Sequence, residues 1–140
     1  KLASGNAYYT RFMHGYSYLQ TDRPALALGQ ADQLLALDKR EPIGYVLAGK
    51  AMSQLGRLHE ALLMLIEAHE RTDRGEPVRF ALDGAYLLRM IAMLCAKTGD
   101  YDRAKRFIEA YLDTYPDDEP GRKFLNELTE KMESTEIPAT

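Results

Sequence analysis

Histidine, cysteine and acidic side chains are the groups in this sequence that could catalyse a reaction or bind a metal, and their spacing argues against both. His59 is followed by glutamate, as in helical zinc motifs, but Leu63 stands where a second histidine is required. His69 begins the same pattern and meets Asp73 there. Cys95 is the single cysteine, and no histidine or asparagine is placed to form a dyad with it. We therefore predict no catalytic residue, no metal site and no cofactor.

Composition and charge narrow the class of protein further. The chain has 140 residues, 46% hydrophobic and 28% charged, as is usual for one globular domain. A net charge of −3 with interspersed signs argues against a nucleic-acid binder, which normally shows a basic face. The longest apolar runs, such as residues 61–66, are far shorter than the roughly 20 residues that span a bilayer. We expect a soluble protein, cytoplasmic or periplasmic, without membrane insertion.

An internal repeat organises most of the chain. Gly49 follows Gly15 by 34 residues, and Ala61 follows Ala27 by the same interval. Each copy has the pattern of a helix, a short polar turn and a second helix. In the second copy the predicted helices are residues 43–55 and 58–69. Gly56 lies between them and suits the left-handed residue that ends a helix.

A third unit follows after an insertion. The turn at residues 98–102 is of the same kind, but Ala104 comes nine residues later than the period predicts. The extra residues fall within 71–83, and a lengthened helix is predicted over 77–97 with proline in its first turn. The predicted organisation is an N-terminal extension (1–7, natural or added during cloning), one domain at 8–133 with repeats at about 8–41, 42–75 and 77–118 and a capping helix at 120–133, and a flexible tail at 134–140.

These units resemble tetratricopeptide repeats (TPRs), and the resemblance covers residues 8–118. It rests on Tyr45, Gly49, Gly56, Ala61 and Ala68 in the second unit, Gly99, Tyr101, Ala104 and Pro116 in the third, and Gly15, Tyr18 and Ala27 in the first. The small residues have a packing reason, because Gly49 is expected to face Ala61 where two helices approach closely. The resemblance implies an all-α fold, an α-solenoid of three helix-turn-helix repeats with a C-terminal capping helix.

The sequence departs from the TPR pattern in the first and third units. Arg11 stands where an early large aromatic is usual, and Asp22 begins a turn that normally starts with glycine. Ala92 replaces a helix glycine, and Tyr111 fills a position that is usually small. We expect the stack to be looser or differently angled at the third unit.

TPR arrays usually receive a peptide or helix on a concave surface formed by the first helix of each pair. The family's facing pattern puts these residues there: Tyr9, Phe12, Tyr16 and Leu19 from the first unit, Ile43, Val46, Lys50 and Gln54 from the second, and Tyr86, Arg89, Met93 and Lys97 from the third. The first four recur at intervals of 3, 4 and 3 and share one helical stripe. The stripe could instead pack on a preceding repeat or a second copy, and Lys50, Arg89 and Lys97 could be ordinary solvated charges.

The resemblance implies a non-catalytic interaction module, not an enzyme, whose partner is another protein or peptide with an apolar segment and an acidic group near Arg89. Two alternatives stay open: self-assembly into a homo-oligomer, and a TPR segment of a larger enzyme, secretion or polysaccharide-handling assembly. TPR domains that clamp the acidic tails of heat-shock chaperones carry lysine and asparagine where this chain has Phe12, Tyr16, Leu47 and Arg89. A dicarboxylate clamp is therefore not expected.

Overall fold

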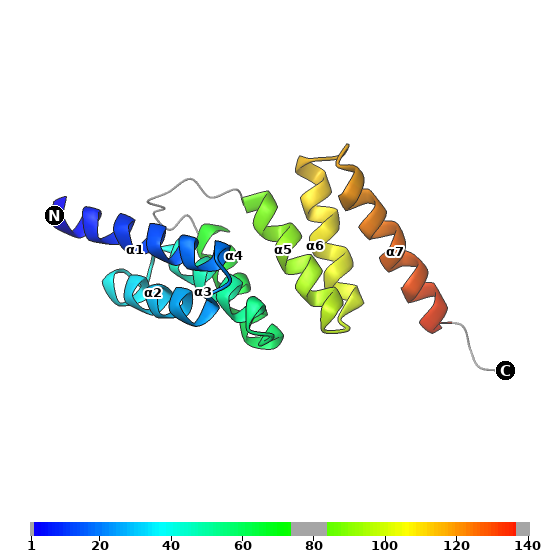
Figure 1. Ribbon diagram of the computed structural model, residues 1–140. Coiled ribbons are helices and arrows are strands. Elements are labelled where there is room, and N and C mark those ends of the chain that lie inside the picture. Colours follow the sequence, from blue (N-terminus) through cyan, green and yellow to red (C-terminus); the bar gives the residue numbers. More distant parts are fainter. Residues whose placement is uncertain (1, 74–83, 137–140) are drawn as a thin grey trace. The chain divides into compact units, whose positions relative to one another are not determined.

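The computed structural model describes residues 2–73 and 84–136, and every regular element in these two ranges is an α-helix (Figure 1). The helices are α1 (Leu2–Gln20), α2 (Pro24–Leu37), α3 (Pro42–Gln54), α4 (Leu58–Asp73), α5 (Gly84–Lys97), α6 (Tyr101–Thr114) and α7 (Glu119–Glu136). They form two compact units, one containing α1 to α4 and the other α5 to α7. The fold is an all-α helical repeat, as the sequence predicted.

The helix boundaries differ from the prediction at the two ends. α1 begins at Leu2, so the helix includes most of the stretch predicted as an N-terminal extension. α7 continues to Glu136, into the stretch predicted as a tail. The predicted start of a lengthened helix at Pro77 lies outside the described residues.

In the first unit, α1 packs on α2 and α3 packs on α4, while α2 and α1 both contact α3. Small residues set how closely these helices approach. A Cβ added at Gly49 would lie 2.6 Å from Leu65 Cδ2 and 3.2 Å from the carbonyl oxygen of Ala61, as the expected Gly49–Ala61 contact requires. Gly15 meets the side chain of Leu47 in the same way. Each glycine therefore makes room for a leucine of a neighbouring helix.

The three helix pairs share one turn geometry. The amide of Arg57 donates to the carbonyl of Met52 at 2.9 Å, and the amide of Asp100 donates to that of Cys95 at 2.9 Å. In the first pair, the amide of Arg23 donates to the carbonyl of Tyr18 at 2.7 Å. Each of these hydrogen bonds spans six residues and ends a helix, and the residue just before the donor has a left-handed conformation. That residue is glycine in two turns, whereas in the first it is Asp22 with φ 59°. Aspartate is among the few other residues that tolerate this conformation.

In the second unit, α6 packs on both α5 and α7. Tyr111 is buried, although repeats of this kind usually have a small residue at its position. Gly121 of α7 makes room for this large side chain, because an added Cβ there would lie 3.1 Å from the Tyr111 ring. Ala92 is fully buried in place of glycine. Asp118 begins α7 by accepting the Gly121 amide at 2.9 Å.

No helix in the described part of the chain combines the length and hydropathy that a membrane crossing requires.

We predict that Gly49→Ala lowers the free energy of unfolding by about 1–2 kcal/mol, because the new methyl group overlaps Leu65 and this outweighs the gain in helix propensity. Gly29→Ala is the matched control in α2, where an added Cβ meets nothing within 4 Å. This control should stabilise the chain by about 0.5–1 kcal/mol. Urea unfolding followed by circular dichroism measures both changes. Equal effects of the two substitutions would contradict this account of helix packing.

Candidate partner-binding surface

An aromatic stripe on α1 is the clearest exposed feature of the first unit. Tyr9 is 52% exposed and Tyr16 is 40% exposed, with the partly buried Phe12 between them. The Phe12 and Tyr16 rings stack with centroids 6.2 Å apart and planes at 23°. Met13, the neighbour of Phe12 on the same helix, is also exposed. We refer to Tyr9, Phe12, Met13 and Tyr16 as the α1 stripe.

Three residues predicted to line the groove lie in the interior. Leu19 is only 8% exposed, and its carbonyl oxygen accepts a 3.2 Å hydrogen bond from the Gln54 side chain, which ties α1 to α3. Val46 is 7% exposed, and Ile43 is buried too. They differ from the prediction because the facing pattern of a helix does not reveal how far its neighbours cover it.

The surface that α3 offers is therefore narrower and more polar than expected. Lys50 is partly buried and Gln54 is exposed. Burial lowers the pKa of the Lys50 ammonium group below its ordinary value of 10.5, because desolvation disfavours the charged form. Leu47, at one of the positions where chaperone-binding TPR domains carry lysine or asparagine, packs against Gly15 and is buried.

In the second unit, α5 carries a stripe of the predicted residues Tyr86, Arg89, Met93 and Lys97. Their spacing of 3, 4 and 4 places them along one side of the helix. Tyr86, Met93 and Lys97 are exposed, and Arg89 is partly buried. The opposite side of α5 is the packing face, with Leu87, Ile91 and Cys95 buried among others. The α5 stripe thus combines apolar and cationic groups, whereas the α1 stripe is uncharged.

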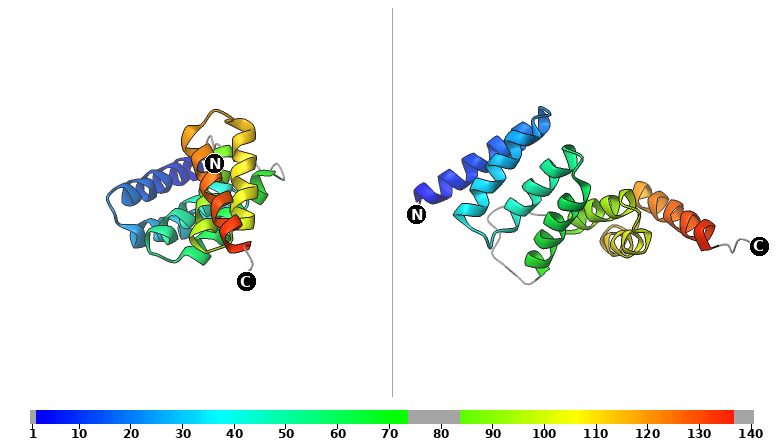
Figure 2. Two further views of the ribbon diagram at one scale, coloured as in Figure 1. Left: turned by 90° about the vertical axis from the view of Figure 1, so that its right-hand side faces the viewer. Right: turned by 90° about the horizontal axis from the view of Figure 1, so that it is seen from below.

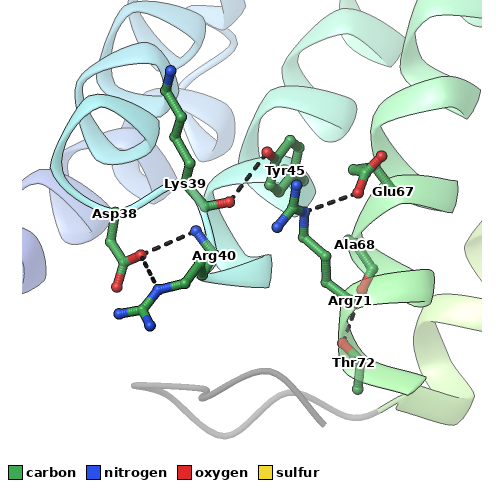
Figure 3. A network of polar contacts seen from close by, with 8 residues as sticks. All are labelled: Asp38, Lys39, Arg40, Tyr45, Glu67, Ala68, Arg71 and Thr72. Atoms are coloured by element: carbon green, nitrogen blue, oxygen red, sulfur yellow. Dashed lines mark hydrogen bonds and ion pairs between the residues drawn. The ribbon is translucent and has the colours of Figure 1, made fainter. Parts of the chain in front are cut away.

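A polar network holds the beginning of α3 against the end of α4 (Figure 3). The Arg71 guanidinium lies 4.8 Å from the centroid of the Tyr45 ring and forms an ion pair with Glu67 at 2.9 Å. The Tyr45 hydroxyl donates to the carbonyl of Lys39 at 3.2 Å. This network could not be predicted from the sequence, because the cation–π contact joins residues 26 positions apart and no motif marks it. These contacts link the loop before α3 to Tyr45 of α3 and to Arg71 of α4.

The groups considered for chemistry lie apart from these stripes. His14 and His59 are exposed, on α1 and α4, and His69 is partly buried on α4. Cys95 is buried in α5, and burial raises the pKa of its thiol, so the reactive thiolate is disfavoured. Within residues 2–73 and 84–136, no three His, Cys, Asp or Glu side chains gather as a metal site requires.

We predict that Lys50→Met raises the free energy of unfolding at pH 7. Because burial lowers the folded-state pKa of Lys50, the folded chain binds this proton less tightly than the unfolded chain, and the charged side chain costs stability. As the pH rises toward 10.5, the folded chain loses this proton first and the wild type gains stability, so the advantage of Lys50→Met shrinks. Urea midpoints at pH 7 and pH 10 measure this, with the exposed Lys97→Met as control. A less stable Lys50→Met at pH 7 would refute the desolvation account.

Comparison with known proteins agrees with the fold. A scan of protein-family models finds no match, and neither does a search of curated proteins. Among solved structures, the first TPR domain of human RPAP3 aligns with a TM-score of 0.78 at 13% identity, covering 96% of this chain and 99% of that one.

Two further structures are similar to the chain. The first TPR of Spaghetti (RPAP3), bound to the HSP90 peptide SRMEEVD, aligns with a TM-score of 0.78 at 12% identity over 91% of this chain and 94% of that one. The Arabidopsis OM64 TPR domain aligns with a TM-score of 0.77 at 11% identity over 91% and 98%. Identities this low carry information about the fold alone. With the repeat period, the shared turns and the glycine contacts, they show that the chain is a helical-repeat domain with the TPR fold.

Proposed function

We propose that the chain is a non-catalytic interaction module that binds a peptide or helical segment of a partner protein through the α1 stripe, with Lys50 of α3 as a further contact. The observation that carries the proposal is the pair of stacked, solvent-accessible rings of Phe12 and Tyr16. Exposed aromatic groups on a rigid helix bury a large area at small entropic cost, and aromatic residues dominate many interfaces.

The fold supports this proposal by analogy. A structure with the same fold, Spaghetti (RPAP3), is bound to the HSP90 peptide SRMEEVD. The mode of binding proposed for this chain differs, because the α1 stripe is uncharged and Lys50 is partly buried with a lowered pKa. An acidic C-terminal tail would find little charge complementarity there. The partner segment is therefore proposed to be apolar or amphipathic.

The α5 stripe is proposed as a second contact face for the same class of partner. Tyr86 and Met93 offer apolar area, while Arg89 and Lys97 can pair with an acidic group. Because α5 belongs to the other unit, its contribution is tested with separate variants of the α5 stripe.

The test begins with peptides selected on the wild-type chain from a random display library. Phe12→Ala combined with Tyr16→Ala should weaken binding of an apolar selected peptide by at least about tenfold, since the substitutions remove the central aromatic anchors. Fluorescence anisotropy measures the affinity, with the SRMEEVD peptide as the negative ligand. Leu63→Ala removes an exposed leucine from α4 and is the matched control. Unchanged affinity in the α1 double variant would rule the stripe out as the site.

A second candidate function is self-association through α2, and a specific observation favours it. Leu26 and Leu37 are exposed on α2, whereas the residues 34 positions later, Glu60 and Arg71, are charged. The leucines lie 11 residues apart on one stripe, so in an antiparallel pair of copies each Leu26 would meet the Leu37 of the other.

Sedimentation equilibrium tests this candidate. We predict a dimer of the wild type at about 100 μM that dissociates when Leu26→Glu and Leu37→Glu place like charges in the interface, because buried carboxylates would be unpaired. Leu63→Glu adds a carboxylate at an exposed leucine of α4 and should leave the dimer intact. A wild-type monomer at this concentration would exclude the candidate.

A further inference from the structure

An open pocket of about 620 Å³ lies between α6 and α7, away from the stripes described above. Figures 1 and 2 show these two helices side by side within the second unit. The pocket is lined by Glu109, Leu112, Asp113, Pro116, Arg122, Leu125 and Asn126. Its volume falls in the range of sites that hold small ligands or the anchoring side chains of a peptide.

The lining has an apolar part and a charged rim. Leu112 and Leu125, one from each helix, are partly buried, so their remaining exposed surface is available to an apolar side chain. Glu109 and Asp113 are exposed four residues apart on α6, which places them on the same side of the helix. On α7 the lining spans about one turn, from Arg122 onward. A short segment therefore fits better than a long helix.

The charged side chains of the rim are available to pair with a ligand. Within the described residues, the side chains of Glu109, Asp113 and Arg122 take part in no hydrogen bond or ion pair. At the start of α6, by contrast, a carboxylate has an ion-pair partner within the chain, since Arg103 Nε lies 2.7 Å from Asp100. The two carboxylates thus form a local negative edge without an internal counter-ion, beside partly exposed leucines.

We propose that this pocket is a second docking site, for a short segment of a partner protein that presents an apolar side chain next to a lysine or arginine. The apolar side chain packs on Leu112 and Leu125, and the cation pairs with Glu109 or Asp113. Arg122 and Asn126 on the opposite wall donate hydrogen bonds to backbone carbonyl oxygens of the segment. The site is separate from the α1 stripe. It selects a basic segment and disfavours an acidic tail.

Three fluorescein-labelled peptides test the site by anisotropy with the full chain. GSKLRLKGS carries the proposed chemistry, GSELELEGS reverses its charge, and GSKSRSKGS lacks its leucines. We expect the first peptide to bind at least about tenfold more tightly than the other two. Glu109→Gln with Asp113→Asn should weaken the first peptide by roughly threefold to tenfold, as expected for the loss of exposed ion pairs.

Two controls make this result specific. Glu127→Gln with Glu130→Gln changes the net charge equally at exposed α7 positions outside the pocket lining and should leave binding unchanged. Phe12→Ala with Tyr16→Ala should also leave it unchanged, which separates this site from the proposed function. Thermal melts followed by circular dichroism confirm that each variant is folded.

Several outcomes would overturn the proposal: failure of GSKLRLKGS to bind, equal binding of the acidic peptide, or equal weakening in the α7 control. If the Glu109 and Asp113 double variant alters sedimentation of the chain alone and leaves peptide binding unchanged, the pocket belongs to an interface between copies and the proposal is wrong.

Discussion

The close approach of paired helices is the constraint on which the other features of this molecule depend. Gly49 admits Leu65 and Gly15 admits Leu47, so at each of these contacts a leucine side chain packs directly on the backbone of the neighbouring helix. Interiors packed at this density leave little room for even one added methyl group. Buried alanines, among them Ala27 and Ala61, continue the same narrow spacing. The helix pairs therefore act as rigid supports, and the faces directed away from the crossings are available for binding.

The division between packing face and outer face explains where recognition can occur. In α5 the apolar packing face contains Leu87 and Ile91, while Tyr86 and Arg89 lie outside it. In α6, Glu109 is exposed and lies outside the packing face, so its carboxylate is accessible to a partner. A repeat fold of this kind separates stability from recognition, because substitutions on the outer faces leave the crossings intact. The α1 stripe and the α6–α7 pocket could thus bind partners of different chemistry.

Local chemistry made the fold predictable, since the 34-residue period and the small residues each have a packing cause that is visible in the sequence. The first turn, where Asp22 replaces glycine, also keeps the shared geometry. Burial of Leu19 and Val46 could not be predicted, because it depends on how far neighbouring helices cover one helix. The α6–α7 pocket was missed for a related reason, since it joins charged residues of two helices that carry no motif. Period and residue type thus predict helix pairing, while the candidate site depends on tertiary contacts.

Amide chemical-shift mapping tests the central claim, that the outer face of α1 receives a partner segment, most directly. The ¹⁵N-labelled chain would be titrated with the tightest apolar peptide selected from the library. The account predicts shifts that saturate along residues 9–16 and at Lys50, with small changes on α2 and on the outer surface of α4. Shifts confined to α2 or α4, with residues 9–16 unaffected at saturation, would contradict it.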